Sequence, residues 1–126
     1  MNNKPLVLVV DDSPLNLDII VNHLPDDYDI AIATNGVEAL EFIEREVPDI
    51  VLLDVIMPLM DGYETCGKIK EKHDIPIIFI TTISDQQSKL RSFELGAVDY
   101  VEKPFEIAEL KARVKTHLDL KLTKDR

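Results

Sequence analysis

The 126-residue sequence is poor in several features that define whole classes of protein. It has a single cysteine, Cys66, which excludes an internal disulfide framework and a zinc site built from several cysteines. It also lacks an excess of basic residues, because 14 Lys and Arg stand against 24 Asp and Glu, for a net charge of −10. A nucleic-acid-binding surface needs a basic face, so we expect this chain to make no direct contact with nucleic acid.

Long apolar stretches are missing as well. No apolar run approaches the roughly 18 residues of a membrane span. The first five residues lead into a short apolar stretch that ends in two aspartates, which is unlike a signal peptide. We therefore expect no membrane partner and a cytoplasmic location.

The length favours one domain, with residues 1–126 forming a single unit and residues 5–118 its core. The last helical pattern continues past residue 118 with no Gly or Pro to stop it. Residues 119–126 are therefore expected to begin a linker to an output domain.

Five short apolar runs predict five buried strands, at residues 6–10, 30–33, 50–53, 75–80 and 97–101. These runs do not alternate with polar residues, which is typical of strands buried on both faces of a parallel sheet. Apolar residues at helical spacing lie between the runs, so the expected order is strand and helix repeated five times. This order favours an α/β fold with helices on both faces of a parallel sheet.

Two glycines are expected to mark helix ends. Gly96 follows the fourth helical segment and fits a C-terminal cap. Gly62 stands at the start of the third helical segment, which we expect it to cap or to enter through a special backbone angle.

Polar residues gather where the predicted strands end, which is where an open α/β sheet binds its ligands. They are three carboxylates, a hydroxyl and an amine: Asp11, Asp12, Asp54, Thr81 and Lys103. Three carboxylates close together repel one another, and a divalent cation relieves the conflict. Oxygen ligands without Cys or His suit Mg²⁺, with Mn²⁺ as the alternative. Such a cation beside a lone carboxylate and a lysine predicts phosphoryl transfer, with a carboxylate oxygen as nucleophile.

Four segments resemble the receiver domain of two-component response regulators. They are Val-Val-Asp-Asp-Ser at 9–13, Leu-Leu-Asp-Val-Ile-Met-Pro-Leu-Met-Asp-Gly at 52–62, Ile-Thr-Thr at 80–82 and Gly-Ala-Val-Asp-Tyr-Val-Glu-Lys-Pro-Phe at 96–105. The resemblance extends from Leu6 to about Leu118. It implies a doubly wound, flavodoxin-like (βα)5 fold whose five parallel strands lie in the order 2-1-3-4-5.

The resemblance implies a role for each matching residue. Asp54 would accept a phosphoryl group from a histidine kinase or a histidine phosphotransfer protein. Mg²⁺ would be bound directly by Asp12, by Asp54 and by the backbone carbonyl of Ile56. Asp11 would help to bind the metal through water or a second contact.

Three further residues complete the implied switch. Thr81 would hydrogen-bond one phosphoryl oxygen, and Lys103 would pair with another from a cis peptide bond with Pro104. Tyr100 would turn inward when Thr81 moves toward the phosphoryl group. The resemblance thus implies a signalling switch that catalyses its own phosphorylation and slow dephosphorylation, and not an enzyme acting on an external substrate.

The sequence departs from the family pattern beside the site. The residue after the switch hydroxyl is usually small, and here it is Thr82. Ile56 and Ile83 are apolar where many members are polar, and water approaching a phosphorylated Asp54 would pass between them. Because neither side chain can orient a water molecule, we expect a long-lived phosphorylated state.

Two other functions stay open at this point. A Mg²⁺-dependent phosphohydrolase of the aspartyl-phosphate type needs a second carboxylate two residues past the nucleophile, where this chain has Ile56. A degenerate receiver, acting only as a protein-interaction module, would have lost an aspartate or the lysine of the site. This sequence keeps all four residues, namely Asp11, Asp12, Asp54 and Lys103.

The face made by the fourth helix, the fifth strand and the fifth helix is expected to change on phosphorylation and to control an output domain or a partner. Charged residues of this face could pair across a two-fold axis and give a phosphorylation-dependent homodimer. They are Glu94, Asp99, Glu102, Lys111, Arg113 and Lys115.

Overall fold

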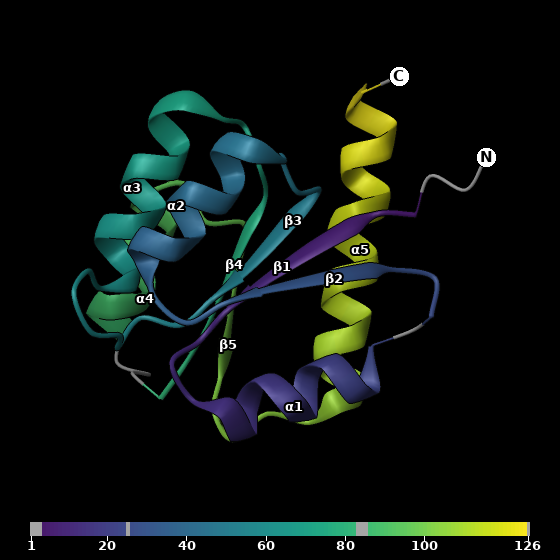
Figure 1. The fold of residues 1–126 in the computed structure, drawn as a ribbon, viewed down its shortest axis with the longest axis horizontal. Helices are drawn as coiled ribbons and strands as arrows, with labels where there is room; N and C mark the ends of the chain where they lie inside the picture. The colour runs from purple at the N-terminus through teal and green to yellow at the C-terminus, as the bar shows by residue number, and fades with distance from the viewer. Residues whose placement is uncertain (1–3, 25, 83–85, 126) are drawn as a thin grey trace.

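The structure, a computed structural model, describes residues 4–24, 26–82 and 86–125 as strands and helices that alternate along the chain (Figure 1). The strands are β1 (Leu6–Val10), β2 (Asp29–Ala33), β3 (Ile50–Leu53), β4 (Ile77–Thr81) and β5 (Asp99–Glu102). The helices are α1 (Pro14–His23), α2 (Gly36–Arg45), α3 (Gly62–Lys72), α4 (Gln86–Glu94) and α5 (Ile107–Asp125).

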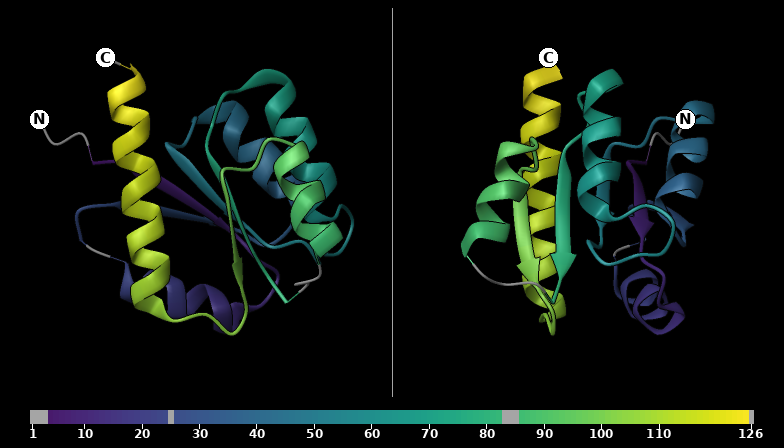
Figure 2. Two further views of the ribbon diagram at one scale, coloured as in Figure 1. Left: turned by 180° about the vertical axis from the view of Figure 1, so that it is seen from behind. Right: turned by 90° about the vertical axis from the view of Figure 1, so that its left-hand side faces the viewer.

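The five strands form one parallel sheet in the order β2-β1-β3-β4-β5, as expected. Successive strand residues point to opposite faces, so each strand contributes to two apolar layers. The layer under α1 and α5 contains Leu17, Ile20, Leu110 and Val114, and the layer under α2 and α3 contains residues such as Ile43. Figure 2 shows α1 and α5 on one side of the sheet, with α2, α3 and α4 on the other.

The boundaries of three strands differ from the prediction. β2 begins at Asp29 and not at residue 30, and β4 and β5 end one residue later than expected, at Thr81 and Glu102. β4 begins at Ile77 and not at residue 75, because Pro76 has no N–H to donate to the ladder. β5 begins at Asp99 and not at residue 97, because the backbone N–H of Ala97 still bonds to Ser92 at the end of α4. Gly96 has φ +101, which confirms its role in ending that helix.

Side-chain caps begin three of the helices. Ser13, Asn35 and Asp61 each accept a hydrogen bond from a backbone N–H of the first turn of α1, α2 and α3. The expectation that Gly62 caps α3 or enters it through a special backbone angle is wrong, because Asp61 caps the helix and φ of Gly62 is not positive. Of the helices in the described ranges, none is long and apolar enough to cross a membrane.

Candidate functional site

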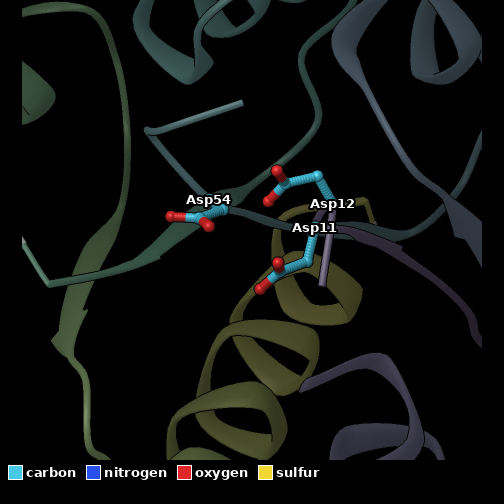
Figure 3. A group of neighbouring side chains, drawn as sticks. All are labelled: Asp11, Asp12 and Asp54. Atoms are coloured by element: carbon cyan, nitrogen blue, oxygen red, sulfur yellow. The ribbon is translucent and has the colours of Figure 1, made fainter. Parts of the chain in front are cut away.

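The parallel sheet brings the predicted polar residues to one edge. Asp11 and Asp12 follow β1, Asp54 follows β3, Thr81 ends β4 and Lys103 follows β5. The three carboxylates lie close together at neighbouring strand ends (Figure 3). Each offers an oxygen to a common group in which these atoms lie within 4.8 Å of one another.

Asp54 is held in place by its backbone. The Asp54 N–H donates to the carbonyl of Val10 on the neighbouring strand at 3.0 Å, and the Gly62 N–H donates to the carbonyl of Val55 at 2.7 Å. A Cβ atom added at Gly62 would lie 2.2 Å from the carbonyl oxygen of Asp54. Only glycine therefore allows α3 to start this close to the Asp54 main chain.

Lys103 is shared between two carboxylates. Its Nζ lies 2.8 Å from Oδ2 of Asp11 and 3.1 Å from Oδ2 of Asp54, and the Lys103–Pro104 peptide is cis, as the resemblance implied. Burial works to lower the pKa of Lys103, but its hydrogen bond with Asp11 and the attraction of Asp54 outweigh burial and raise it. The ammonium group therefore keeps its charge.

Asp54 is short of positive charge. Burial raises the pKa of its carboxyl, Lys103 offsets part of this rise and the charge of Asp11 adds to it. One ammonium cannot neutralise the carboxylates around it, so the site favours a further cation. Its donors are oxygens only, which fits a hard divalent ion such as Mg²⁺ or Mn²⁺.

The two consecutive aspartates differ in their surroundings. Asp11 is 2% exposed, and its Oδ1 accepts a hydrogen bond from the Ser13 N–H at 2.9 Å while its Oδ2 accepts one from Lys103. Asp12 is exposed. The carboxylate of Asp12 is therefore the more accessible of the pair to a hydrated cation.

Thr81 and Tyr100 both lie inside the protein. Thr81 is fully buried, and its carbonyl accepts a hydrogen bond from the Lys103 N–H at 2.8 Å. Tyr100 is 8% exposed, and Nζ of Lys89 lies 5.8 Å from the centroid of its ring. The aromatic ring at the expected switch position is thus inward in this structure.

Two of the residues that depart from the family pattern, Ile56 and Thr82, are exposed close in sequence to the strand-end residues Asp54 and Thr81. The side chain of Ile56 is 58% exposed, and Thr82 is exposed as well. Ile83 lies outside the described residues. The position two residues past Asp54 therefore presents an apolar surface to solvent.

Sequence reasoning missed one neighbour of the site, Asn16. This residue lies in the first turn of α1, and its Nδ2 is 3.5 Å from Oδ2 of Asp11. A polar side chain one helical turn after the Ser13 cap points back toward the strand end, and that spacing is the signal that could have found it.

Comparison with known proteins agrees with this geometry. The family model described as "Response regulator receiver domain" matches residues 7–115. Among curated proteins, a "Probable cyclic di-GMP phosphodiesterase" of Vibrio cholerae is 46% identical over 94% of this chain and 28% of its own length. A "Probable transcriptional regulator ycf27" of Guillardia theta is 40% identical over 94% of this chain and 47% of its own length. The chain thus spans less than half the length of these relatives.

A solved structure is similar over nearly the whole chain. The signal receiver domain of a Luxo repressor protein from Vibrio parahaemolyticus superposes with a TM-score of 0.93 and 29% sequence identity, covering 97% of this chain and 95% of its own. The parallel sheet, its strand order and the helices on both faces are those of the flavodoxin-like receiver fold. The chain belongs to the response regulator receiver domain family.

Proposed function

We propose that Asp54 accepts a phosphoryl group from a histidine kinase or a histidine phosphotransfer protein, and that this reaction switches the chain between two signalling states. The observation that carries the proposal is the sharing of Lys103 between Asp11 and Asp54, at 2.8 and 3.1 Å. An ammonium group in this position could form an ion pair with an oxygen of a phosphoryl group on Asp54.

The proposed reaction moves the phosphoryl group from nitrogen to oxygen. A carboxylate oxygen of Asp54 attacks phosphorus, and the new O–P bond forms as the P–N bond to the donor imidazole breaks. The electron pair of the broken bond stays on the imidazole nitrogen. Lys103 offsets charge on one phosphoryl oxygen, and the hydroxyl of Thr81 donates a hydrogen bond to another.

The proposed direct ligands of Mg²⁺ are Asp12, Asp54 and the backbone carbonyl of Ile56, and Asp11 assists. Mn²⁺ is the alternative cation. The bound cation supplies positive charge that the single lysine cannot. Because Asp12 is exposed and Asp11 is already hydrogen-bonded, we expect Asp12→Ala to weaken Mg²⁺ binding more than Asp11→Ala does. Calorimetric Mg²⁺ titrations of both variants measure this, and equal affinity of Asp12→Ala and the wild type contradicts it.

Control of the output is proposed to pass through α4, β5 and α5. Lys89 of α4 lies over the Tyr100 ring and also pairs with Glu102 at 3.0 Å. Glu102 immediately precedes Lys103. A movement of Lys103 toward a phosphoryl group therefore has a short route to α4.

A phosphorylation-dependent homodimer through this face remains part of the proposal, but several of its charges are already paired within one chain. Asp99 pairs with Arg113 at 2.7 Å, and Glu102 pairs with Lys89. Pairing across a two-fold axis would exchange these contacts for equivalent ones. Leu90 and Phe93, which are 59% and 48% exposed on α4, supply apolar area to bury.

The domain boundaries, the linker and the location are also proposals. α5 continues through Asp125, and a helix that passes beyond the core at residue 118 fits a linker to an output domain. The curated relatives that this chain matches are more than twice its length, in keeping with such an arrangement. The cytoplasmic location expected from the sequence stays a prediction.

The two alternative functions fit the site less well. A phosphohydrolase needs a carboxylate where Ile56 stands, and Ile56 cannot transfer a proton. A receiver that only binds partners would not need a lysine held between two carboxylates. Burying such a charged cluster costs desolvation energy, and partner binding alone does not require it.

Phosphorylation by a small donor tests the proposed function. The wild type, incubated with acetyl phosphate and Mg²⁺, is expected to gain the mass of one phosphoryl group, and Asp54→Asn is expected not to gain it. Asp61→Asn, which alters the α3 cap outside the carboxylate cluster, is the matched control. An equal adduct yield in Asp54→Asn and the wild type would reject Asp54 as the phosphoacceptor.

A further inference from the structure

The carboxylate of Asp11 has donors on both of its oxygens. Oδ1 accepts from the Ser13 N–H at 2.9 Å, and Oδ2 lies between Nζ of Lys103 at 2.8 Å and Nδ2 of Asn16 at 3.5 Å. Asn16 is half-buried in the first turn of α1, where its backbone N–H donates to Oγ of Ser13 at 3.4 Å. Its amide group is therefore held beside Asp11 by the same turn that begins the helix.

Lys103 is not a dedicated hydrogen-bond donor to Asp11, because it also contacts Asp54. Its Nζ is also 3.1 Å from Asp54, and it is the cation that a phosphoryl group on Asp54 would attract. As Lys103 turns toward that group, Oδ2 of Asp11 loses part of a charge-assisted hydrogen bond. A buried carboxylate that loses a donor pays a desolvation penalty unless another donor replaces it.

The amide of Asn16 is suited to that replacement. It is a neutral donor, so it neither repels an incoming divalent cation nor changes charge with pH. It already lies near the oxygen that Lys103 would leave, at a distance that can shorten. A cationic side chain at the same place would oppose the metal, and an apolar one would leave Asp11 without the donor.

We propose that Asn16 is a positioning residue that keeps the carboxylate of Asp11 turned toward the cation site, both before phosphorylation and when Lys103 moves to the phosphoryl group. This inference rests on the proposed function. It predicts that Asn16 acts on the Mg²⁺ dependence of phosphorylation and little on the maximal rate.

The test compares one substitution at two places on α1. Asn16→Leu removes the amide with little change in size, and Asn22→Leu makes the same change at an exposed position of the same helix. Calorimetry gives the Mg²⁺ affinity without any phosphodonor, and acetyl phosphate assays give the half-saturating Mg²⁺ concentration and the maximal rate. Asn16→Leu is expected to raise both the dissociation constant and the half-saturating concentration by about three- to tenfold. Asn22→Leu is expected to change neither.

A conservative variant separates the donor from the fold. Asn16→Gln keeps an amide and is expected to recover part of the Mg²⁺ affinity that Asn16→Leu loses, while thermal unfolding in EDTA checks that all variants are folded. Equal Mg²⁺ affinity in Asn16→Leu and Asn22→Leu overturns the inference, and so does a wild type that binds no Mg²⁺. Phosphoryl mass gain on the wild type reports separately on the proposed function, because Mg²⁺ affinity is measured without a phosphodonor.

Discussion

Two aspartates at opposite ends of the sheet differ in how many cationic and hydrogen-bond-donating groups surround their carboxylates. Asp54, at the carboxyl edge, shares one ammonium group with Asp11. Asp99 begins β5 at the amino end, and its carboxylate accepts hydrogen bonds from Arg113 at 2.7 and 2.8 Å, from Nε2 of His117 at 3.0 Å and from the Tyr100 N–H at 2.8 Å. One carboxylate competes for a donor, and the other is surrounded by donors.

The two pKa values shift in opposite directions for this reason. Burial raises the pKa of Asp54, and Lys103 only partly offsets the rise. Burial also acts to raise the pKa of Asp99, but hydrogen bonds from Arg113, the Tyr100 backbone and His117 outweigh it and lower the pKa. Scarce donors leave Asp54 suited to the proposed phosphoacceptor role, whereas plentiful donors let Asp99 link β5 to α5.

The largest effect is expected from removing the ammonium group of Lys103, the only one that contacts Asp54 among the described residues. Lys103→Met is expected to slow phosphorylation by acetyl phosphate on the order of a hundredfold at saturating Mg²⁺, because charge on a phosphoryl oxygen loses its partner. Lys89→Met, which removes a lysine paired with Glu102 outside the site, is the control. The rate of phosphoryl mass gain measures both, and similar rates in the two variants contradict the role given to Lys103.

The backbone support of Asp54 is expected to show the next largest effect. Gly62→Ala places a methyl group against the Asp54 carbonyl, so the free energy of unfolding should fall by about 1–3 kcal/mol. Gly67→Ala, in the same helix with nothing within 4 Å of the added Cβ, should instead stabilise the protein by about 0.5–1 kcal/mol. Urea unfolding measures the free energy of unfolding of both variants. Equal changes in that free energy would contradict the importance of close packing at Gly62.

Neutral variants at the two ends of the sheet should have opposite effects on stability at pH 7. The lowered pKa of Asp99 gives stability that is present above its ordinary value of 3.8 and is lost as pH falls through the folded value. The raised pKa of Asp54 gives stability that is present below 3.8 and is lost as pH rises through the folded value. Asp99→Asn should therefore destabilise the protein by about 1–2 kcal/mol at pH 7, and Asp54→Asn should stabilise it.

Urea unfolding in EDTA, repeated from pH 3 to pH 8, measures how each substitution changes the free energy of unfolding and in which direction. The deficit of Asp99→Asn should shrink as the pH falls toward the acid end, and the advantage of Asp54→Asn should do the same. Lower stability of Asp54→Asn than of the wild type at pH 7 would contradict the shortage of donors at that carboxylate.

The gathering of polar residues at the carboxyl end of the sheet was predictable from the sequence, and the cluster around Asp99 at the amino end was not. Asp11, Asp54 and Lys103 each follow an apolar run, and parallel strands bring their ends to one edge whatever the side-chain details are. The cluster around Asp99 depends on how α5 lies against β5, which no local pattern encodes. The sequence therefore shows Asp99 only as a charge that could pair across a two-fold axis. Gly62 was predicted to matter for its backbone angle, but what matters is the space beside Asp54.

The smallest expected effect concerns the lifetime of the proposed phosphorylated state of Asp54. Hydrolysis of an aspartyl phosphate needs a water molecule in line with the scissile O–P bond. Ile56, with a side chain 58% exposed beside Asp54, cannot orient that water, and neither can Ile83, which lies outside the described residues. Correct positioning of a nucleophile lowers the barrier substantially, so we expect slow phosphate loss.

Replacing both isoleucines with polar residues tests this expectation directly. Ile56→Asn combined with Ile83→Glu should lose phosphate faster than the wild type in Mg²⁺, by about tenfold for each ~1.4 kcal/mol by which a positioned water lowers the barrier. Val47→Asn, at a 54% exposed position before the amino end of β3, controls for the loss of exposed apolar surface. If the double variant matches or trails the wild type, the isoleucines pack against a partner or a loop and do not control the approach of water.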